Sequence, residues 1–188
     1  LSPIPLAEAA SWDLKAIEKS AETAASEAAA SGINWTFGPM MDVSKDARWG
    51  RVMEGAGEDT YLGSLIAKAR VKGFQGTGFG DTSAVMACAK HFPGHGDVAV
   101  DSHLDLPIIS KSLVQLDSLE LYPFRQVFSS GIASAMIAHL FIPSIDNRPN
   151  RASSLSKANI DSLLRKELHF DGLTFTDALE MQGVKKFF

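Results

Sequence analysis

Ser83-Ala-Val-Met-Ala-Cys-Ala-Lys-His91 is the stretch that decides the fold class of this chain. It is an almost continuous apolar run that ends in two polar residues, Lys90 and His91. Strands of a parallel sheet are buried on both faces, so they carry apolar residues at successive positions instead of alternating ones. The run therefore predicts a buried parallel strand that delivers Lys90 and His91 at its carboxyl end.

Segments on both sides of this run repeat the same pattern. Strands are predicted at 34–38, 132–140 and 173–176, each after a stretch in which apolar residues recur every three or four positions. Those stretches predict amphipathic helices, which cover Leu14–Ala28, Leu62–Ala69, Leu113–Val127 and Ile160–Leu168. Ser112 and Gln115 match a capping box at the start of the third helix. Strands that alternate with helices in this way predict a parallel α/β fold.

Polar residues follow every predicted strand, namely Asp42, Lys90 with His91, His139 and Asp177. A TIM-type (β/α) barrel gathers its chemistry at this carboxyl edge, whereas a doubly wound sheet uses a switch point and usually a glycine-rich phosphate loop. The glycine-rich segment 76–80 follows a helix, so it predicts an ordinary loop. We expect a TIM-type barrel. A complete barrel has eight strands and about 250 residues, so we expect residues 1–188 to form one partial barrel domain with about four to six strands.

Composition excludes several classes of function. The chain has 188 residues, of which 45% are hydrophobic and 21% charged, and its net charge is −4, as in ordinary globular proteins. Lys and Arg form no basic stripe, so nucleic acid is not expected as a partner. No apolar run is long enough to cross a membrane, and the N-terminus lacks the features of a signal peptide. The single cysteine, Cys88, excludes an internal disulfide and is predicted to be a core residue.

The segment from Lys90 to His103 is the densest in chemistry, with three histidines, two aspartates and a lysine. A zinc site is one interpretation. His95 and His103 lack helical ligand spacing, however, and Pro93 and Gly94 prevent a regular helix. We therefore expect no metal and no cofactor. A solvated polar loop is the other interpretation, but a rigid Pro-Gly turn beside a buried strand end favours a functional site.

Asp101-Ser102-His103 suggests a carboxylate that orients an imidazole, which would make His103 a proton shuttle. A serine nucleophile is rejected, because Ser102 lacks a nucleophile elbow and adjacent residues of an extended loop point apart. Asp177 closes the last predicted strand. It is either the N-cap of a helix or a catalytic carboxylate, since a carboxylate at a barrel rim facing a histidine acid/base suits retaining glycoside hydrolysis.

At this point the chain resembles a known family. Lys90-His-Phe-Pro-Gly-His-Gly-Asp97 with Asp101-Ser-His103 is similar to the bacterial β-N-acetylglucosaminidase branch of glycoside hydrolase family 3. The resemblance implies that His103 is the general acid/base, that Asp101 orients it, and that Asp177 in Phe175-Thr-Asp-Ala-Leu-Glu-Met181 is the nucleophile. It also implies that Arg51, which follows Trp49-Gly50, contacts the sugar, and that Lys90 and His91 hold sugar hydroxyls. We add His139 as a further substrate-binding residue.

The two halves of the chain resemble different branches of that family. Residues 1–91, with Arg48-Trp-Gly-Arg51, look like the β-glucosidase and β-xylosidase branch, and residues 92–188 look like the N-acetylglucosaminidase branch. A chimera joined near Lys90-His91 is favoured slightly over a natural intermediate.

The resemblance implies a carbohydrate substrate, with terminal β-linked N-acetylglucosamine as the sugar released. The alternatives are a β-glucosidase or β-xylosidase and a catalytically inactive half-barrel. A histidine acid/base would also let phosphate approach, so phosphorolysis stays open beside hydrolysis. The family implies the bacterial cytoplasm or periplasm, and open barrel edges predict self-association.

Overall fold

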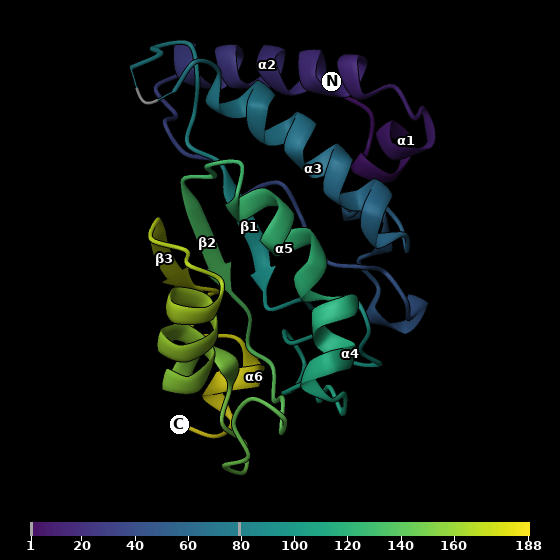
Figure 1. Cartoon of the computed structure of the whole chain (residues 1–188), viewed down its shortest axis with the longest axis vertical. Helices are drawn as coiled ribbons and strands as arrows, with labels where there is room; N and C mark the ends of the chain where they lie inside the picture. Colours follow the sequence, from purple (N-terminus) through teal and green to yellow (C-terminus); the bar gives the residue numbers. More distant parts are fainter. Residues whose placement is uncertain (1, 79) are drawn as a thin grey trace.

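The computed structural model describes residues 2–78 and 80–188 (Figure 1). Its α-helices are α1 (Pro5–Ala10), α2 (Leu14–Ala30), α3 (Thr60–Gln75), α4 (Leu113–Ser118), α5 (Leu121–Phe128) and α6 (Gln182–Lys185). Its strands are β1 (Cys88–Phe92), β2 (Ser134–Ile137) and β3 (Leu173–Thr176). Three short 3-10 helices, η1 (Ala47–Trp49), η2 (Val52–Glu54) and η3 (Ser153–Leu155), and the π-helix η4 (Ala158–Glu167) complete the described elements.

The sheet is parallel throughout and follows the chain order β1-β2-β3. Cys88 pairs with Ser134 at one end of the β1–β2 pair, and Ile137 pairs with Thr176 at the end of the β2–β3 pair. The predicted strand at 34–38 runs parallel to residues 86–90, but it forms no regular ladder among the described residues. The isolated bridges Trp35–Met86 and Met40–Lys90 and a hydrogen bond from the Cys88 N–H to the carbonyl of Gly38 at 2.8 Å join the two segments. Pro39 has no N–H to donate, which interrupts a regular ladder there.

The sheet is curved in the sense that a barrel requires. The rings of Trp35 and Phe175 meet at 4.5 Å between centroids, and Phe37 lies 5.1 Å from Trp35. β1 and β2 separate these two outer segments, and neighbouring strands lie about 4.8 Å apart. The rings can meet only because the sheet is concave on this face. Together with the parallel order, this curvature confirms the predicted TIM-type α/β fold, and the described residues form an incomplete barrel.

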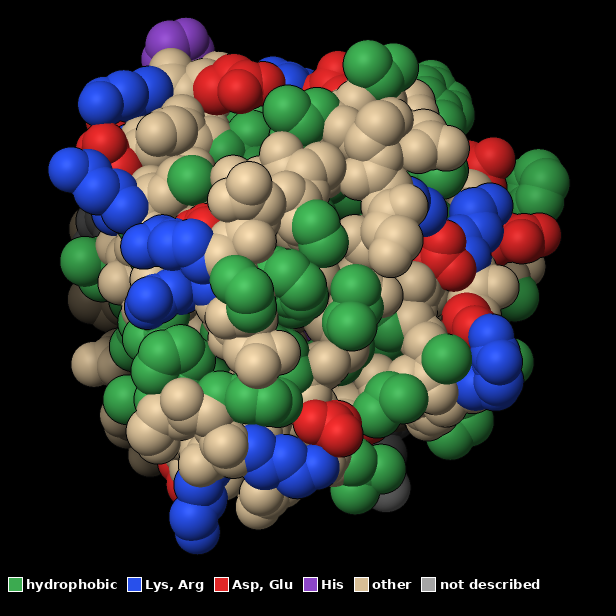
Figure 2. Space-filling view, turned by 90° about the horizontal axis from the view of Figure 1, so that it is seen from below, with side chains coloured by type: hydrophobic (Ala, Val, Ile, Leu, Met, Phe, Trp, Pro, Cys, Tyr) green, Lys and Arg blue, Asp and Glu red, His purple; other side chains and the backbone are tan. Residues whose placement is uncertain are grey.

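Helices cover the opposite, convex face (Figure 1). The main core joins Val71 of α3, Phe124 of α5 and Leu164 of η4 to the buried residues of β1 and β2. Helices α2 and α3 pack closely at Gly73, where a Cβ atom would lie 2.3 Å from the carbonyl oxygen of Glu18. α6 and the C-terminus lie beyond the carboxyl ends of the strands, and Figure 2 shows this end of the molecule, with apolar side chains in the middle and charged ones around the margin.

Two of the predicted helices differ from the expectation. The third was predicted as one helix over 113–127, but it breaks at Leu119–Glu120 into α4 and α5. The cause is Pro123, whose ring lacks an N–H and clashes with the carbonyl four residues earlier. The capping box of Ser112 and Gln115 is present as predicted. The fourth helix is a π-helix instead of an α-helix.

Cys88 and the glycine-rich segment are the remaining features to place. Cys88 is fully buried in β1, as predicted. α3 ends at Gln75 and turns follow, although Phe79 of the predicted loop 76–80 lies outside the described residues. Within the described ranges, none of the helices is both long and apolar enough to cross a bilayer. Leu173 of β3 is 58% exposed, and self-association through this edge stays a prediction.

Candidate active site

Asp42, Arg51, His91 and Asp177 gather at the carboxyl ends of the strands, and we call them the strand-end cluster. Asp177 directly follows β3, and its backbone N–H donates to the carbonyl of Ile137 at 2.9 Å, which extends the β2–β3 ladder by one rung. The His91 side chain lies between two carboxylates. Its Nδ1 is 2.7 Å from Oδ2 of Asp42, and its Nε2 is 3.9 Å from Oδ2 of Asp177.

Asp42 fixes the orientation of His91. Its side chain is fully buried, and its Oδ1 accepts hydrogen bonds from the backbone N–H groups of His91 at 3.2 Å and His95 at 2.7 Å. Burial alone would raise the pKa of the Asp42 carboxyl, but the attraction of His91 and these hydrogen bonds hold it below its ordinary value. A carboxylate at Asp42 accepts from Nδ1–H of His91, which leaves the Nε2 atom of His91 as an acceptor facing Arg51.

Glu54 fixes the orientation of the Arg51 guanidinium within the strand-end cluster. The guanidinium donates from Nε to Oε1 of Glu54 at 2.8 Å and from Nη2 to Oε2 at 2.7 Å, a bidentate pair within one short helical turn. Its Nη1 lies 3.4 Å from Nε2 of His91, and the Trp49 ring lies 5.6 Å beneath the guanidinium carbon. The hydrogen bonds from Arg51 lower the pKa of the Glu54 carboxyl. Arg51 and His91 are therefore brought together as predicted.

Lys90 shares a cavity with Glu54. It is half-buried and lines a cavity of about 300 Å³ whose walls include Phe37, Met53 and Glu54. Glu54 borders this cavity and also binds Arg51, which in turn faces His91, but neither Arg51 nor His91 lines the cavity.

The segment 97–106, which we call the acid/base loop, carries the second predicted group. Oδ1 of Asp101 lies 2.7 Å from Nδ1 of His103 and accepts from the His103 backbone N–H at 3.0 Å. Burial alone would raise the pKa of the Asp101 carboxyl, but these hydrogen bonds lower it. The His103 side chain is 56% exposed, and in the described part of the chain its Nε2 has no hydrogen-bond partner. The free nitrogen is the one that would exchange a proton with a substrate.

Helix α6 supports this loop. The Gly183 N–H donates to the carbonyl of Ser102 at 3.0 Å, and Lys186 donates to the carbonyl of Leu104 at 3.0 Å. A Cβ at Gly183 would lie 3.2 Å from that same Ser102 oxygen, so a side chain there would press the loop outward. The loop returns to the sheet at Ile109, whose N–H donates to the carbonyl of Phe141 at 3.0 Å.

His139 is placed differently from the other predicted residues. It has no exposed surface, its Nδ1 bonds to the hydroxyl of Ser154 at 2.7 Å, and its Nε2 bonds to the carbonyl of Ala178 at 2.9 Å. Both ring nitrogens are therefore occupied by the protein, and neither faces a sugar. In this geometry His139 holds the peptide that follows Asp177.

Asp42, Glu54 and His95 contact the predicted site residues, although the sequence analysis assigned none of the three a catalytic or sugar-binding role. Asp42 had one signal, its place in the loop that follows the first predicted strand. Glu54 had another, its position three residues after Arg51, where opposite charges pair on one helical turn. Among the residues that the structure describes, no group of three or more His, Cys, Asp or Glu side chains is arranged to hold a metal ion.

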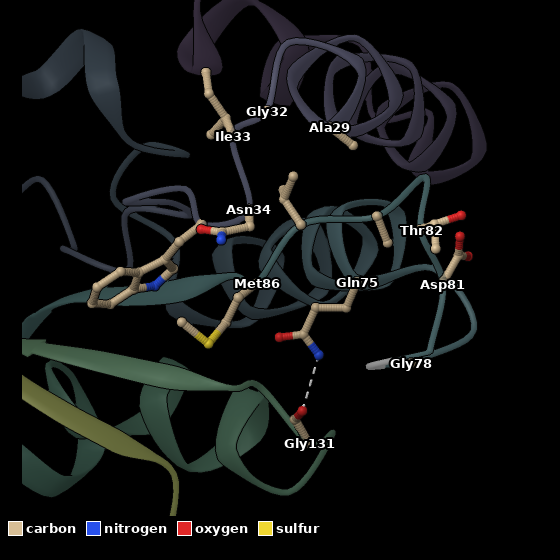
Figure 3. A pocket seen from close by; sticks show the side chains of 13 residues that line it. Ala29, Gly32, Ile33, Asn34, Gln75, Gly78, Asp81, Thr82, Met86 and Gly131 are labelled. Carbon is tan, nitrogen blue, oxygen red and sulfur yellow. Dashed lines mark hydrogen bonds between the residues drawn. The ribbon is translucent and has the colours of Figure 1, made fainter.

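A larger cavity, of about 680 Å³, lies at the amino ends of the strands (Figure 3). Its walls include Asn34, Trp35 and Met86, and Gln75 closes one side by donating to the carbonyl of Gly131 at 3.0 Å. None of the predicted site residues lines it. In barrels of this type the chemistry lies at the opposite edge.

Fold and site together define a barrel-type α/β protein with paired carboxylates and histidines at its carboxyl rim. The chain belongs to glycoside hydrolase family 3, since residues 1–188 match the glycosyl hydrolase family 3 N-terminal domain. It is 35% identical over 175 residues to the periplasmic beta-glucosidase of Salmonella typhimurium, covering 93% of this chain and 22% of that protein. It is 34% identical over 182 residues to the beta-hexosaminidase of Chromobacterium violaceum, covering 92% of this chain and 47% of that protein.

Among solved structures, the chain is similar to a family 3 beta-N-acetylglucosaminidase from Paenibacillus, with a TM-score of 0.89 and 35% identity over 97% of this chain and 34% of that one. The chain thus spans less than half the length of these relatives. One relative from each branch aligns with more than nine tenths of the chain. The expected junction near Lys90-His91 gains no support, because neither half lacks a match in either branch.

Proposed function

We propose that this chain carries the catalytic site of a retaining glycosidase that releases terminal β-linked N-acetylglucosamine. The observation that supports it most is the position of Asp177. Its side chain is 17% exposed at the rim, beside His91 and its buried Asp42 partner. A rim carboxylate that is accessible and also supported by oriented neighbours is suited to attack a sugar carbon.

In the proposed first step, an Asp177 oxygen attacks the anomeric carbon and the glycosidic C–O bond breaks. His103, protonated on Nε2, gives its proton to the leaving oxygen. In the second step, His103 takes a proton from water while that water attacks the anomeric carbon, and the bond to Asp177 breaks. Nδ1 of His103 donates to Asp101 throughout, which keeps Nε2 as the atom that gains and loses the proton.

Arg51, Lys90 and His91 form the proposed sugar-binding side. A pyranose presents hydroxyls at fixed spacing, and these three side chains offer donors and one imidazole acceptor around Glu54. His139 takes a supporting role, since its bond to the Ala178 carbonyl steadies the backbone beside the nucleophile.

The choice of sugar rests on the Asp101–His103 pair. The stretch Asp101-Ser-His103 resembles the N-acetylglucosaminidase branch of the family, in which it supplies the acid/base within this domain. The names of the hexosaminidase and N-acetylglucosaminidase relatives support this choice. A β-glucosidase is the second candidate, supported by the similarity to the Salmonella protein. That protein's name also supports the periplasm over the cytoplasm as the compartment.

The test compares chromogenic β-N-acetylglucosaminide and β-glucoside with the full-length protein, side by side. We expect faster turnover of the N-acetylglucosaminide. Faster turnover of the glucoside would exchange the two candidates, and no turnover of either would favour an inactive barrel. Incubation with a 2-fluoro glycosyl fluoride should label the peptide that contains Asp177, and a label on another residue would contradict the proposed nucleophile.

A further inference from the structure

His95 is a buried histidine that the proposed mechanism does not use. It is 1% exposed, and its ring stacks on Trp49 with centroids 5.3 Å apart and planes at 29°. Its backbone N–H donates to Oδ1 of Asp42 at 2.7 Å, and its Nε2 lies 3.0 Å from the hydroxyl oxygen of Ser102. The residue therefore contacts the strand-end cluster with its backbone and the acid/base loop with its ring.

The backbone around His95 has little freedom to move. The carbonyl of Gly96 accepts from the Lys45 N–H at 2.9 Å, and a Cβ at Gly96 would lie 2.2 Å from the Val43 carbonyl oxygen. These contacts press residues 95 and 96 against the segment that follows Asp42. The fixed backbone and the stacking on Trp49 restrict the orientation of the imidazole. In this orientation its Nε2 faces the hydroxyl of Ser102.

The chemical state of the ring suits a structural link. Burial lowers the pKa of His95 to about 4, so the imidazole is neutral near pH 7. A neutral ring can bond to the Ser102 hydroxyl without placing a positive charge beside His91. Ser102 is itself buried and stands between Asp101 and His103 in the chain.

We infer that His95 is a positioning residue that ties the acid/base loop to the strand-end cluster through Ser102. The catalytic part of this inference rests on the proposed function. The link between His95 and Ser102, which we call the tether, concerns the position of the loop and does not depend on that function. The connection runs from Asp42 through the His95 backbone and ring to Ser102, so the carboxylate that orients His91 also holds the loop that carries His103.

The first test measures backbone hydrogen exchange at His103, Leu104 and Asp105 in the full-length protein, because these three N–H groups bond to Asp101. His95→Ala and Ser102→Ala should each speed this exchange by about tenfold, as local opening becomes easier. Exchange in α2 and α3 should stay as in the wild type. Ser129→Ala, which removes a remote hydroxyl, serves as the matched control. Unchanged loop exchange in Ser102→Ala would overturn the tether even if His95→Ala fails to fold.

The second test separates positioning from general damage. Values of kcat/KM are compared for an aryl glycoside with a good leaving group and for an alkyl glycoside with a poor one. His95→Ala should lose about tenfold more activity on the poor leaving group, because only that substrate needs a well-placed acid. His95→Gln, whose amide can still reach Ser102, should restore most of the loss. Equal losses on both substrates would refute the positioning role, whereas an inactive wild type would refute the proposed function and leave the exchange test to decide the tether.

Discussion

The molecule builds the same chemical pair twice, in two different settings. In the strand-end cluster, Asp42 holds Nδ1 of His91 at 2.7 Å, with side chains that are 0% and 3% exposed. In the acid/base loop, Asp101 holds Nδ1 of His103 at the same 2.7 Å, with side chains that are 23% and 56% exposed. Residue type, bonding atoms and distance are alike, so the environment alone distinguishes the two pairs.

The difference in burial suits the two pairs to different roles in the proposed mechanism. The Nε2 atom of His91 faces Arg51 and lies near Asp177, so its surroundings are protein and, in the proposal, sugar. The Nε2 atom of His103 is open to solvent and can exchange protons with water. The buried pair suits binding and the exposed pair suits proton transfer.

Asp177→Ala is the change with the largest expected effect, since in the proposed mechanism Asp177 forms the covalent bond to the sugar. We expect kcat/KM to fall by about 10⁴-fold or more on every substrate, because losing a nucleophile removes the covalent route. Steady-state assays with both sugars measure this. Asp171→Ala, which removes an exposed carboxylate at the opposite end of β3, is the control and should keep full activity. An active Asp177→Ala variant would discard the nucleophile assignment.

His103→Ala tests the exposed pair. We expect kcat/KM on substrates with poor leaving groups to fall by about 10²- to 10⁴-fold, the usual contribution of a general acid. Substrates with good leaving groups should be nearly unaffected in kcat/KM, since their first step needs little acid. A series of aryl glycosides with leaving groups of different acidity gives this dependence. A flat series would remove His103 from the acid role.

Asp42→Asn and Asp101→Asn, compared directly, sharpen the contrast between the pairs. The amide introduced by Asp42→Asn would keep an oxygen for His91 but lose the charge, and small displacements of binding groups cost about 10²-fold in rate. That loss should be the same for good and poor leaving groups. The Asp101→Asn variant should show a smaller loss, confined to poor leaving groups. If the two variants respond identically to the leaving group, the division of roles is wrong.

The last expected effect concerns stability at acidic pH and not turnover. Folding lowers the pKa of His95 from its ordinary value of 6.5 to about 4, so between these values the unfolded chain binds more protons. Stability from neutral His95 is therefore complete above pH 6.5 and is lost as the pH falls to about 4, by about 3 kcal/mol. Burial raises the pKa of Glu120, which makes the stability change with pH in the opposite direction just above pH 4.5. This contribution is the same in the wild type and in a His95 variant, so a comparison of the two removes it.

Denaturant unfolding of the wild type and of His95→Gln between pH 4 and 7 isolates this contribution. The variant should lose less stability on acidification, and its curve should converge on that of the wild type at low pH. Curves that stay parallel over the whole range would show that His95 is not the group responsible.

The sequence indicated the strands well because buried parallel strands are written as apolar runs, as at 83–91. The sequence indicated the helix break at Leu119–Glu120 less well. Pro123 is a helix breaker, but the helical spacing of the apolar residues continues across the break. The π-helical form of η4 could not be predicted, because over ten residues the apolar spacing of a π-helix cannot be distinguished from that of an α-helix.

The prediction of site residues was limited in a similar way, because a local sequence pattern does not show which distant residues meet. Lys90, His91, Asp101, His103 and Asp177 could be proposed from the sequence because local motifs carry them. Asp42 meets His91 across 49 positions in the chain, and no local pattern encodes that pairing. His139 follows a strand just as Asp177 does, but which way a side chain turns after a strand depends on neighbours such as Ser154.

The register of β2 against β3 has a consequence for how this scaffold can be altered. Asp177 is the rung after the pair Ile137–Thr176, and side chains along a strand alternate between the two faces. Inserting or deleting one residue within 173–176 would turn the carboxylate toward the helical layer and put a threonine or alanine at the rim. The acid/base loop has no such alternation to preserve between Asp97 and Leu106. Engineering by loop exchange is therefore limited by strand register on the β3 side, and on the side of the acid/base loop by the side-chain contacts of Asp101, Ser102 and His103.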